Sequence, residues 1–236
     1  MLPVLSMLIK SVILGGHFPL ASYRGLLTSA RQWTLMGNSM ALASMVTTLT
    51  VAVGVPLGIL LGKTDLPFRR FFTVLFVIPL LIPPYIIAVS WFDLLGREGL
   101  LVHLSGVSAT TTAGLLFGLP GCVAVLFSIF LPIPMLLTMI LLRTINPRLE
   151  EAGRLVSGWR GVMKGITIPL ILPGVLLSAM LVFLLSFGEF SVPNFLRYDV
   201  FPVESFARFS AFYDFKAATA AAVPLVAVML ILLLAE

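Results

Sequence analysis

"LEEAGRLVSGWRGVMKGITIP", residues 149–169, is the most informative stretch of this sequence for its fold. It lies in a charged island: seven of the chain's 15 basic and 10 acidic side chains fall between Arg143 and Lys164. The flanks are nearly free of charge, since residues 99–142 hold no Asp, Glu, Lys or Arg and residues 165–188 hold none either. The stretch is therefore a polar link between two apolar segments.

The composition indicates a membrane protein. Hydrophobic residues make up 59% of the chain and charged residues 11%, whereas about a quarter of a soluble domain is charged. So much apolar surface requires lipid to cover it. The net charge is +5, but the basic residues lie between apolar runs and form no basic face, which argues against nucleic-acid binding. The single cysteine, Cys122, excludes an internal disulfide and a cysteine-based metal cluster.

The gaps between charges define the membrane spans. A spanning helix needs ~20 apolar residues. Five uncharged stretches meet that length, at 36–61, 71–92, 115–142, 166–188 and 217–235. The first stretch, residues 1–10, is too short to cross; we interpret it as the far end of a further helix, with a short interfacial segment as the alternative. The expected fold is an all-α, polytopic transmembrane domain.

Basic residues in the links predict the orientation. Lys63, Arg69 and Arg70 crowd one short link, and five basic residues lie in 143–165. The alternation of spans places both links on the same side. The basic residues of the other side are nearly as many but are spread through longer loops and mixed with acidic ones. By density, the two crowded links are expected in the cytoplasm.

The charged link has the pattern of a short amphipathic element. Asn146-Pro147 is a helix-start signal, and Ser157-Gly158 predicts a turn between two short helices. One apolar stripe recurs at steps of three and four residues: Leu149, Ala152, Val156, Trp159 and Met163. Such an element docks into a groove of another protein. The alternative is a helix that rests on lipid headgroups.

The same stretch resembles the cytoplasmic signature of binding-protein-dependent ABC transporter permeases: Glu-Ala-Ala, three residues, Gly, nine residues, Ile-x-Leu-Pro. Ile166, Ile168 and Pro169 match its end, with isoleucine for leucine. Either Glu150-Glu151-Ala152 or Glu151-Ala152-Gly153 stands for its opening triplet, each with a departure in residue or spacing. Residues 64–91 and 181–220 are similar to ferric-iron-type permeases, and the chain resembles the first half of their two-copy chains.

This resemblance implies a single permease domain over residues 1–236, with a cytoplasmic coupling helix inside the loop 143–165. It implies import by alternating access in the bacterial or archaeal cytoplasmic (inner) membrane. The expected partners are ABC ATPase subunits that hydrolyse the ATP, a second permease half, and an extracytoplasmic solute-binding protein that delivers solute to loops 96–112 and 190–216. Contact with the ATPase is expected at Glu150, Glu151, Ala152, Gly158, Trp159, Ile166 and Pro169.

Neither an enzyme nor a bound cofactor is expected of this chain. Ferric iron is the cargo that the subgroup suggests, although thiamine, sulfate, molybdate and phosphonate importers share the architecture. Two other classes remain as alternatives: a proton-coupled secondary carrier and a structural membrane subunit. A proton-coupled carrier normally needs ionisable groups within its spans, and the five predicted spans have no charged side chain.

Four residues are candidates for the translocation pathway. Glu189 lies at the outer end of a span, where a carboxylate faces water, protein or a pathway; the alternative is an interfacial carboxylate. Pro83, Pro84 and Tyr85 lie where prolines break another span, which predicts either a bent helix that lines a pathway or a kinked packing helix.

Three smaller motifs favour packing over chemistry. Gly62-Lys63-Thr64 imitates the end of a phosphate-binding loop, but Leu57 replaces that motif's first glycine, so Lys63 is interpreted as a boundary charge. Gly54, Gly58 and Gly62, spaced by four, predict close helix packing. His17 and His103 have no partner at metal-ligand spacing, so no metal site is expected.

Overall fold

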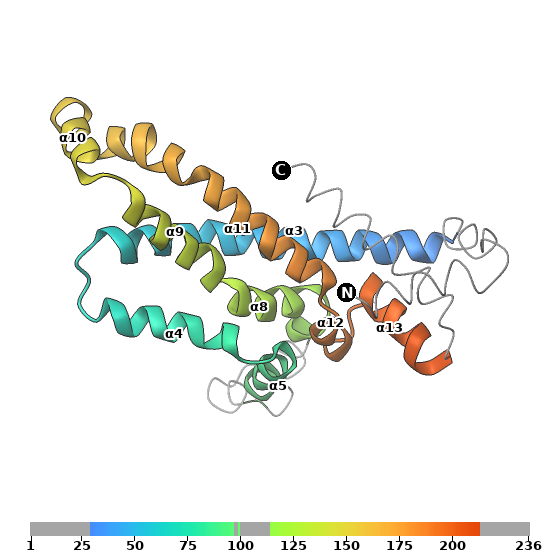
Figure 1. Cartoon of the computed structure of the whole chain (residues 1–236). Helices are drawn as coiled ribbons and strands as arrows, with labels where there is room; N and C mark the ends of the chain where they lie inside the picture. The colour runs from blue at the N-terminus through green and yellow to red at the C-terminus, as the bar shows by residue number, and fades with distance from the viewer. Residues whose placement is uncertain (1–28, 97–98, 100–113, 213–236) are drawn as a thin grey trace, which may run out of the picture.

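The computed structural model describes residues 29–96, 99 and 114–212. The predicted span 217–235, the N-terminal stretch 1–10 and both histidines lie outside the described residues. Figure 1 shows the arrangement of the helices. Their bounds are α3 Ala30–Lys63, α4 Arg69–Leu81, α5 Pro84–Leu95, α8 Leu119–Phe130, α9 Pro132–Thr144, α10 Pro147–Val162, the π-helix η1 Met163–Thr167, α11 Ile168–Gly188, α12 Ser191–Phe195 and α13 Phe201–Phe212. The described part of the chain has no strand, which confirms the all-α prediction.

Three of the predicted spans are confirmed as long apolar helices. The uncharged run 36–61 lies within α3, which is 34 residues long. The span predicted at 115–142 corresponds to α8 and α9, which together run from Leu119 to Thr144. The span predicted at 166–188 is α11, which continues directly from α10 and η1. By length and composition the described residues hold three possible membrane-crossing helices, or up to four if a bent pair is one span.

The span predicted at 71–92 is not one continuous helix. It forms α4 and α5, which meet at an angle of 107°. A proline disfavours the helical conformation in the residue that precedes it. Ile82 precedes Pro83 and Pro83 precedes Pro84, and both adopt extended ψ angles, of 135° in each case. The prolines therefore set the break where the sequence predicted a bend.

The close packing predicted for the glycine row is confirmed. In α3, a Cβ atom on Gly58 would lie 2.6 Å from the carbonyl oxygen of Met135 in α9. A Cβ atom on Gly54 would lie 2.7 Å from Cγ of Pro134. Neither distance leaves room for a methyl group, so the two helices approach each other along this row of glycines. The main core lies beside it and includes Leu42, Val46, Val125, Leu126 and Val182.

The two ends of the bundle are different. One end, at the left of Figure 1, holds the last residues of α3 and α9, the start of α4, and α10. The opposite end holds α12, α13 and the start of α3. There Asn38 Nδ2 donates to the Asp199 carbonyl oxygen over 2.9 Å, and the Phe201 amide donates to Ser39 Oγ over 2.9 Å. The left end is the one where the sequence predicts the crowded basic links.

Candidate functional site

The charged link forms a helical hairpin. Asn146 Oδ1 accepts a hydrogen bond from the Arg148 amide over 3.0 Å, and Pro147 takes the first helical position, as predicted. Gly158 interrupts α10 with φ 64° and ψ −179°. A positive φ strains any residue with a Cβ atom, so glycine is required at this turn. The predicted break at Ser157-Gly158 is confirmed.

The two arms of the hairpin pack against each other at a second glycine, Gly153. A Cβ atom on Gly153 would lie 2.8 Å from Cδ1 of Ile166 and 3.0 Å from Cγ2 of Val162. The first part of α10 therefore lies directly against the segment that returns through η1. Because η1 continues into α11 without a loop, the hairpin is joined to the membrane helix by continuous helical backbone.

An ion pair anchors the hairpin to α3. Glu150 is only 6% exposed, and its Oε2 lies 2.5 Å from Nζ of Lys63, the last residue of α3. Its other oxygen, Oε1, accepts a hydrogen bond from Thr167 Oγ1 over 3.0 Å. One carboxylate thus ties together the end of α3, the first turn of α10 and the end of η1.

The partners of Glu150 keep its carboxylate charged. Burial by itself raises the pKa of this group, since a charge is less stable away from water. The hydrogen bonds from Lys63 and Thr167, and the positive charges of Lys63 and Arg154, act in the opposite direction and prevail. The net effect lowers the pKa of Glu150 below its ordinary value of 4.5.

The tip of the hairpin presents an apolar surface. Leu155 and Val156 are each 89% exposed, and Leu149 and Trp159 are exposed as well. The guanidinium carbon of Arg154 lies 4.7 Å from the centroid of the Trp159 ring, a cation–π distance. Water is a poor environment for this cluster, so the tip has the character of a contact surface.

The predicted contact residues divide into two groups. Glu151, Ala152, Gly158, Trp159 and Pro169 are exposed, as a contact requires. Glu150 and Ile166 have other positions: Glu150 is buried and engaged within the chain, and Ile166 is half-buried and packs toward Gly153. Both side chains contact other parts of the hairpin or of α3, and their predicted contact with the ATPase stays a prediction.

Sequence reasoning missed three residues of this site. Leu155 lies beside the predicted stripe, and its signal was a second apolar residue next to Val156 in an otherwise charged helix. The sequence predicts Lys63 only as a boundary charge, whereas the structure pairs it with Glu150. Thr167 gave no signal, because an isolated threonine in an apolar run has no distinctive pattern.

Glu189 caps a short helix. Its Oε1 accepts hydrogen bonds from the Ser191 amide over 2.8 Å, from the Val192 amide over 3.4 Å and from Ser191 Oγ. These contacts satisfy donors at the start of α12. Its second oxygen, Oε2, forms no hydrogen bond within residues 29–96, 99 and 114–212. Its role in a pathway stays a prediction.

The remaining pathway candidates lie next to the same short helix. Pro83 and Pro84 form the break between α4 and α5, and Tyr85 follows in the first turn of α5. The Tyr85 ring packs edge-on against Phe195 of α12, with 5.3 Å between centroids. The structure therefore brings the proline break close to the helix that Glu189 caps.

The candidate site contains no recognisable metal centre. Within the described ranges, no group of three or more His, Cys, Asp or Glu residues could hold a metal ion. Of the charged groups of the hairpin, Glu150 is engaged in holding the fold, whereas Glu151 and Arg160 are exposed beside the apolar Leu155 and Val156. The exposed apolar end of the hairpin suits contact with another protein.

Sequence comparison finds relatives among membrane permeases, although no family model matches the chain. A probable molybdenum ABC transporter permease of Haloferax volcanii is 31% identical over 170 residues, which cover 70% of this chain and 59% of that protein. The molybdenum permease ModB of Haemophilus influenzae is 34% identical over 156 residues, which cover 64% and 65%. The match thus spans less than two thirds of the length of both relatives.

A ferric-type relative is more distant. The putative ferric transport permease FbpB 1 of Haemophilus influenzae is 25% identical over 195 residues, which cover 81% of this chain and 30% of that protein. The predicted ferric-iron subgroup is therefore not confirmed, because the more similar relatives are molybdenum permeases.

Solved structures share the fold. The MetNI methionine ABC transporter contains a chain that matches with a TM-score of 0.70 and 18% identity, over 88% of this chain and 95% of that one. A bacterial ABC transporter that imports alginate contains another, with a TM-score of 0.73 and 16% identity, over 98% and 86%. By length and composition, the described part of the chain has the long apolar helices of a multi-pass membrane protein, as predicted.

Proposed function

We propose that this chain, which has the fold of an ABC transporter permease, is the membrane-spanning subunit of an ATP-driven, binding-protein-dependent importer. The hairpin of α10 is its docking element for a separate ATPase subunit, where ATP is hydrolysed. A second permease half and an extracytoplasmic solute-binding protein complete the assembly. This proposal is supported by the fold and by relatives that are named permeases.

The proposal rests on one observation: the exposed end of the hairpin is apolar, and the start of the hairpin is fixed to α3 by an ion pair. Leu155 and Val156 are almost fully exposed, while Glu150 at the base is buried and paired with Lys63. A helix that only rested on lipid would gain nothing from such an anchor. A helix that receives force from a partner needs a rigid base, because a loose hairpin would bend and would not move the membrane helices.

The continuity from α10 to α11 gives the mechanism. When the ATPase subunits close on ATP, they would move the tip of the hairpin. The motion would pass through η1 into α11 and, through the Lys63–Glu150 pair, into α3. The helices would then shift as rigid bodies and alternate the accessible side of the membrane. No observation on the described helices favours the proton-coupled carrier or the purely structural subunit.

Copurification tests the docking. The chain carries an affinity tag and is expressed with the ABC ATPase encoded nearest to it. Leu155→Glu and Val156→Glu place a charge in the apolar tip, and each is expected to lower the recovered ATPase by about tenfold or more, since a desolvated charge costs several kcal/mol. Trp159→Ala should lower recovery less, because only part of the contact area is removed.

A matched control separates docking from general damage. Phe68 is 80% exposed at the same end of the bundle but lies in the link before α4, outside the hairpin. Phe68→Glu makes the same exchange of an apolar side chain for an acidic one. We expect it to retain the ATPase. Equal recovery with all four variants and the unmodified chain would refute the docking assignment.

The proposed cargo is molybdate, an oxyanion. This follows the two relatives named as molybdenum permeases, which exceed the ferric-type relative in identity. The test is ATP-dependent uptake into vesicles that contain the reconstituted importer and its solute-binding protein. Molybdenum is measured by mass spectrometry, with ferric citrate as the competitor. Uptake of iron instead of molybdenum would restore the ferric assignment and leave the importer class intact.

A further inference from the structure

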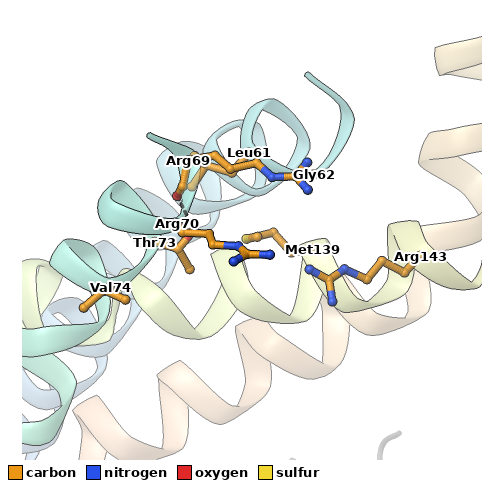
Figure 2. Close-up of a pocket in the computed structure, with 8 residues that line it drawn as sticks. All are labelled: Leu61, Gly62, Arg69, Arg70, Thr73, Val74, Met139 and Arg143. Carbon is orange, nitrogen blue, oxygen red and sulfur yellow. Dashed lines mark hydrogen bonds between the residues drawn. The ribbon is translucent and has the colours of Figure 1, made fainter. Parts of the chain in front are cut away.

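A basic pocket opens at the same end of the bundle as the hairpin. It measures about 580 Å³ and lies between the end of α3, the first turns of α4 and the end of α9. Arg69, Arg70 and Arg143 line it, together with Thr73 and the apolar Met139. Figure 2 shows the guanidinium groups of Arg70 and Arg143 directed toward each other across the pocket. Two separate helices therefore supply its positive charge.

This charge is not balanced within the pocket. No acidic residue lines it, and none of the three arginines forms an ion pair with a carboxylate in the part of the chain that the structure describes. Asp65 lies beside Arg69 and Arg70 but lines the adjacent, smaller pocket. Glu150 is engaged by Lys63. The three guanidinium groups therefore give the pocket a net positive charge.

We propose that this pocket binds a tetrahedral oxyanion group, such as a phosphate. Three guanidinium groups around one cavity repel each other, and an anion between them would be attracted by all three and offset this repulsion. Guanidinium donors also match the oxygen pairs of phosphate-like groups in a bidentate manner. Thr73 Oγ1 donates a hydrogen bond to the Arg69 carbonyl oxygen over 2.9 Å. The arginines are therefore the groups that would donate hydrogen bonds to the anion.

Two sources can supply such a group. The pocket has apolar walls, formed by Leu61, Val74 and Met139 (Figure 2). It lies at the end of the bundle where α3 and α9 end and α4 begins (Figure 1). A phosphate on an anionic lipid headgroup would fit there with its glycerol against these walls. A free oxyanion in solution, including a transported one, offers the same oxygens without the apolar part.

The test measures both sources on the full chain. The protein is placed in nanodiscs of zwitterionic lipid, and binding of inorganic phosphate and of molybdate is measured by equilibrium dialysis in 0.1 M chloride, at which the Debye length is about 10 Å. In a second arm, native mass spectrometry measures how many molecules of phosphatidic acid and of phosphatidylcholine remain bound to the protein, and the two numbers are compared. Binding in the dialysis arm identifies a free oxyanion as the ligand. Retention only in the second arm identifies a lipid headgroup.

A charge-matched pair of variants decides whether the pocket is responsible. Arg70→Gln with Arg143→Gln removes two pocket charges. Arg148→Gln with Arg160→Gln removes two exposed charges of the hairpin outside the pocket. We expect about a tenfold or greater loss of affinity in the first double variant, since hydrogen bonds to charged groups are the strong ones, and less than about a twofold loss in the second.

Two results would overturn the inference: an equal loss in both double variants, which would indicate attraction by net charge alone, or no binding in either arm. Thermal unfolding of each variant verifies that the protein is folded. The experiment requires neither the ATPase nor transport. Its failure would therefore leave the proposed function standing, and failure of the docking test would leave this pocket standing.

Discussion

Lys63 Nζ lies 2.5 Å from Glu150 Oε2 and joins the end of α3 to the first turn of α10, 87 residues later. The pair is almost buried, with 16% of the lysine side chain and 8% of the glutamate side chain exposed. It connects the hairpin to a membrane helix other than the one that follows it in sequence. Movement of the hairpin is therefore shared between α3 and α11.

Removal of one partner should destabilise the protein. Glu150→Gln leaves the Lys63 ammonium partly buried without its counter-charge, which is expected to cost about 1–3 kcal/mol in the free energy of unfolding. Thermal unfolding in detergent measures the loss. Lys63→Met with Glu150→Leu removes both charges and should recover part of it, since an apolar pair often replaces a buried ion pair at little cost. A double variant less stable than Glu150→Gln would argue against the pair as the cause.

The same carboxylate should give the protein a distinct acid sensitivity. The folded state lowers the pKa of Glu150 below 4.5, so the folded protein binds this proton less readily than the unfolded chain. The stabilisation is therefore complete above the unfolded value and is lost as the pH falls through the lowered folded value. The difference in melting temperature between the unmodified chain and Glu150→Gln should shrink below pH 4.5. A difference that stays constant from pH 6 to the lowest pH at which the fold persists would contradict the assignment.

Glu150 and Glu151 show which features of the site cannot be predicted from the sequence. The two carboxylates are adjacent in the sequence, and the sequence predicts contact with the ATPase for both. Which one is buried depends on how α10 is rotated against α3, and that contact joins residues 87 positions apart. Local patterns carry no information about such a rotation.

Other features depended on local chemistry and were predictable. Lipid as a solvent requires uncharged helices, so α3 and α11 followed from the charge gaps. The turn at Gly158 followed from a conformational preference of one residue. At the proline break the position was predictable but the 107° angle was not, because the direction of α5 depends on its packing against α12.

Gly158 should be sensitive to the smallest substitution. With φ at 64°, Gly158→Ala places a Cβ atom in a strained backbone conformation that costs about 1–3 kcal/mol. The turn would relax and displace the apolar tip, so recovery of the ATPase in copurification should fall although no contact atom is removed. Gly165→Ala is the matched control, since that residue has no positive φ and its added Cβ would have no atom within 4 Å. Equal recovery from both variants would contradict the strain argument.

The glycine row in α3 should tolerate no methyl group where α9 approaches. On Gly58 the added Cβ would also lie 2.8 Å from Cβ of Thr138, so Gly58→Ala must push the helices apart. We expect a loss of about 1–3 kcal/mol, typical of an overpacked core. Gly37→Ala, in the same helix but with no atom within 4 Å of the added Cβ, should be neutral or stabilising, because alanine favours helix over glycine by about 1 kcal/mol. Thermal unfolding of the two variants compares them directly, and an unchanged melting temperature of Gly58→Ala would contradict the close approach of α3 and α9.

Two substitutions separate the structural role of Glu189 from its predicted role in the pathway. Glu189→Gln keeps an oxygen that can accept from the Ser191 amide, so the start of α12 should remain capped and the melting temperature nearly unchanged. Glu189→Ala removes the cap and should cost about 1 kcal/mol. If the charge serves the pathway through the second oxygen, both variants should slow uptake in the reconstituted importer. Normal uptake by Glu189→Gln would leave Glu189 as a helix cap alone and would remove it from the pathway.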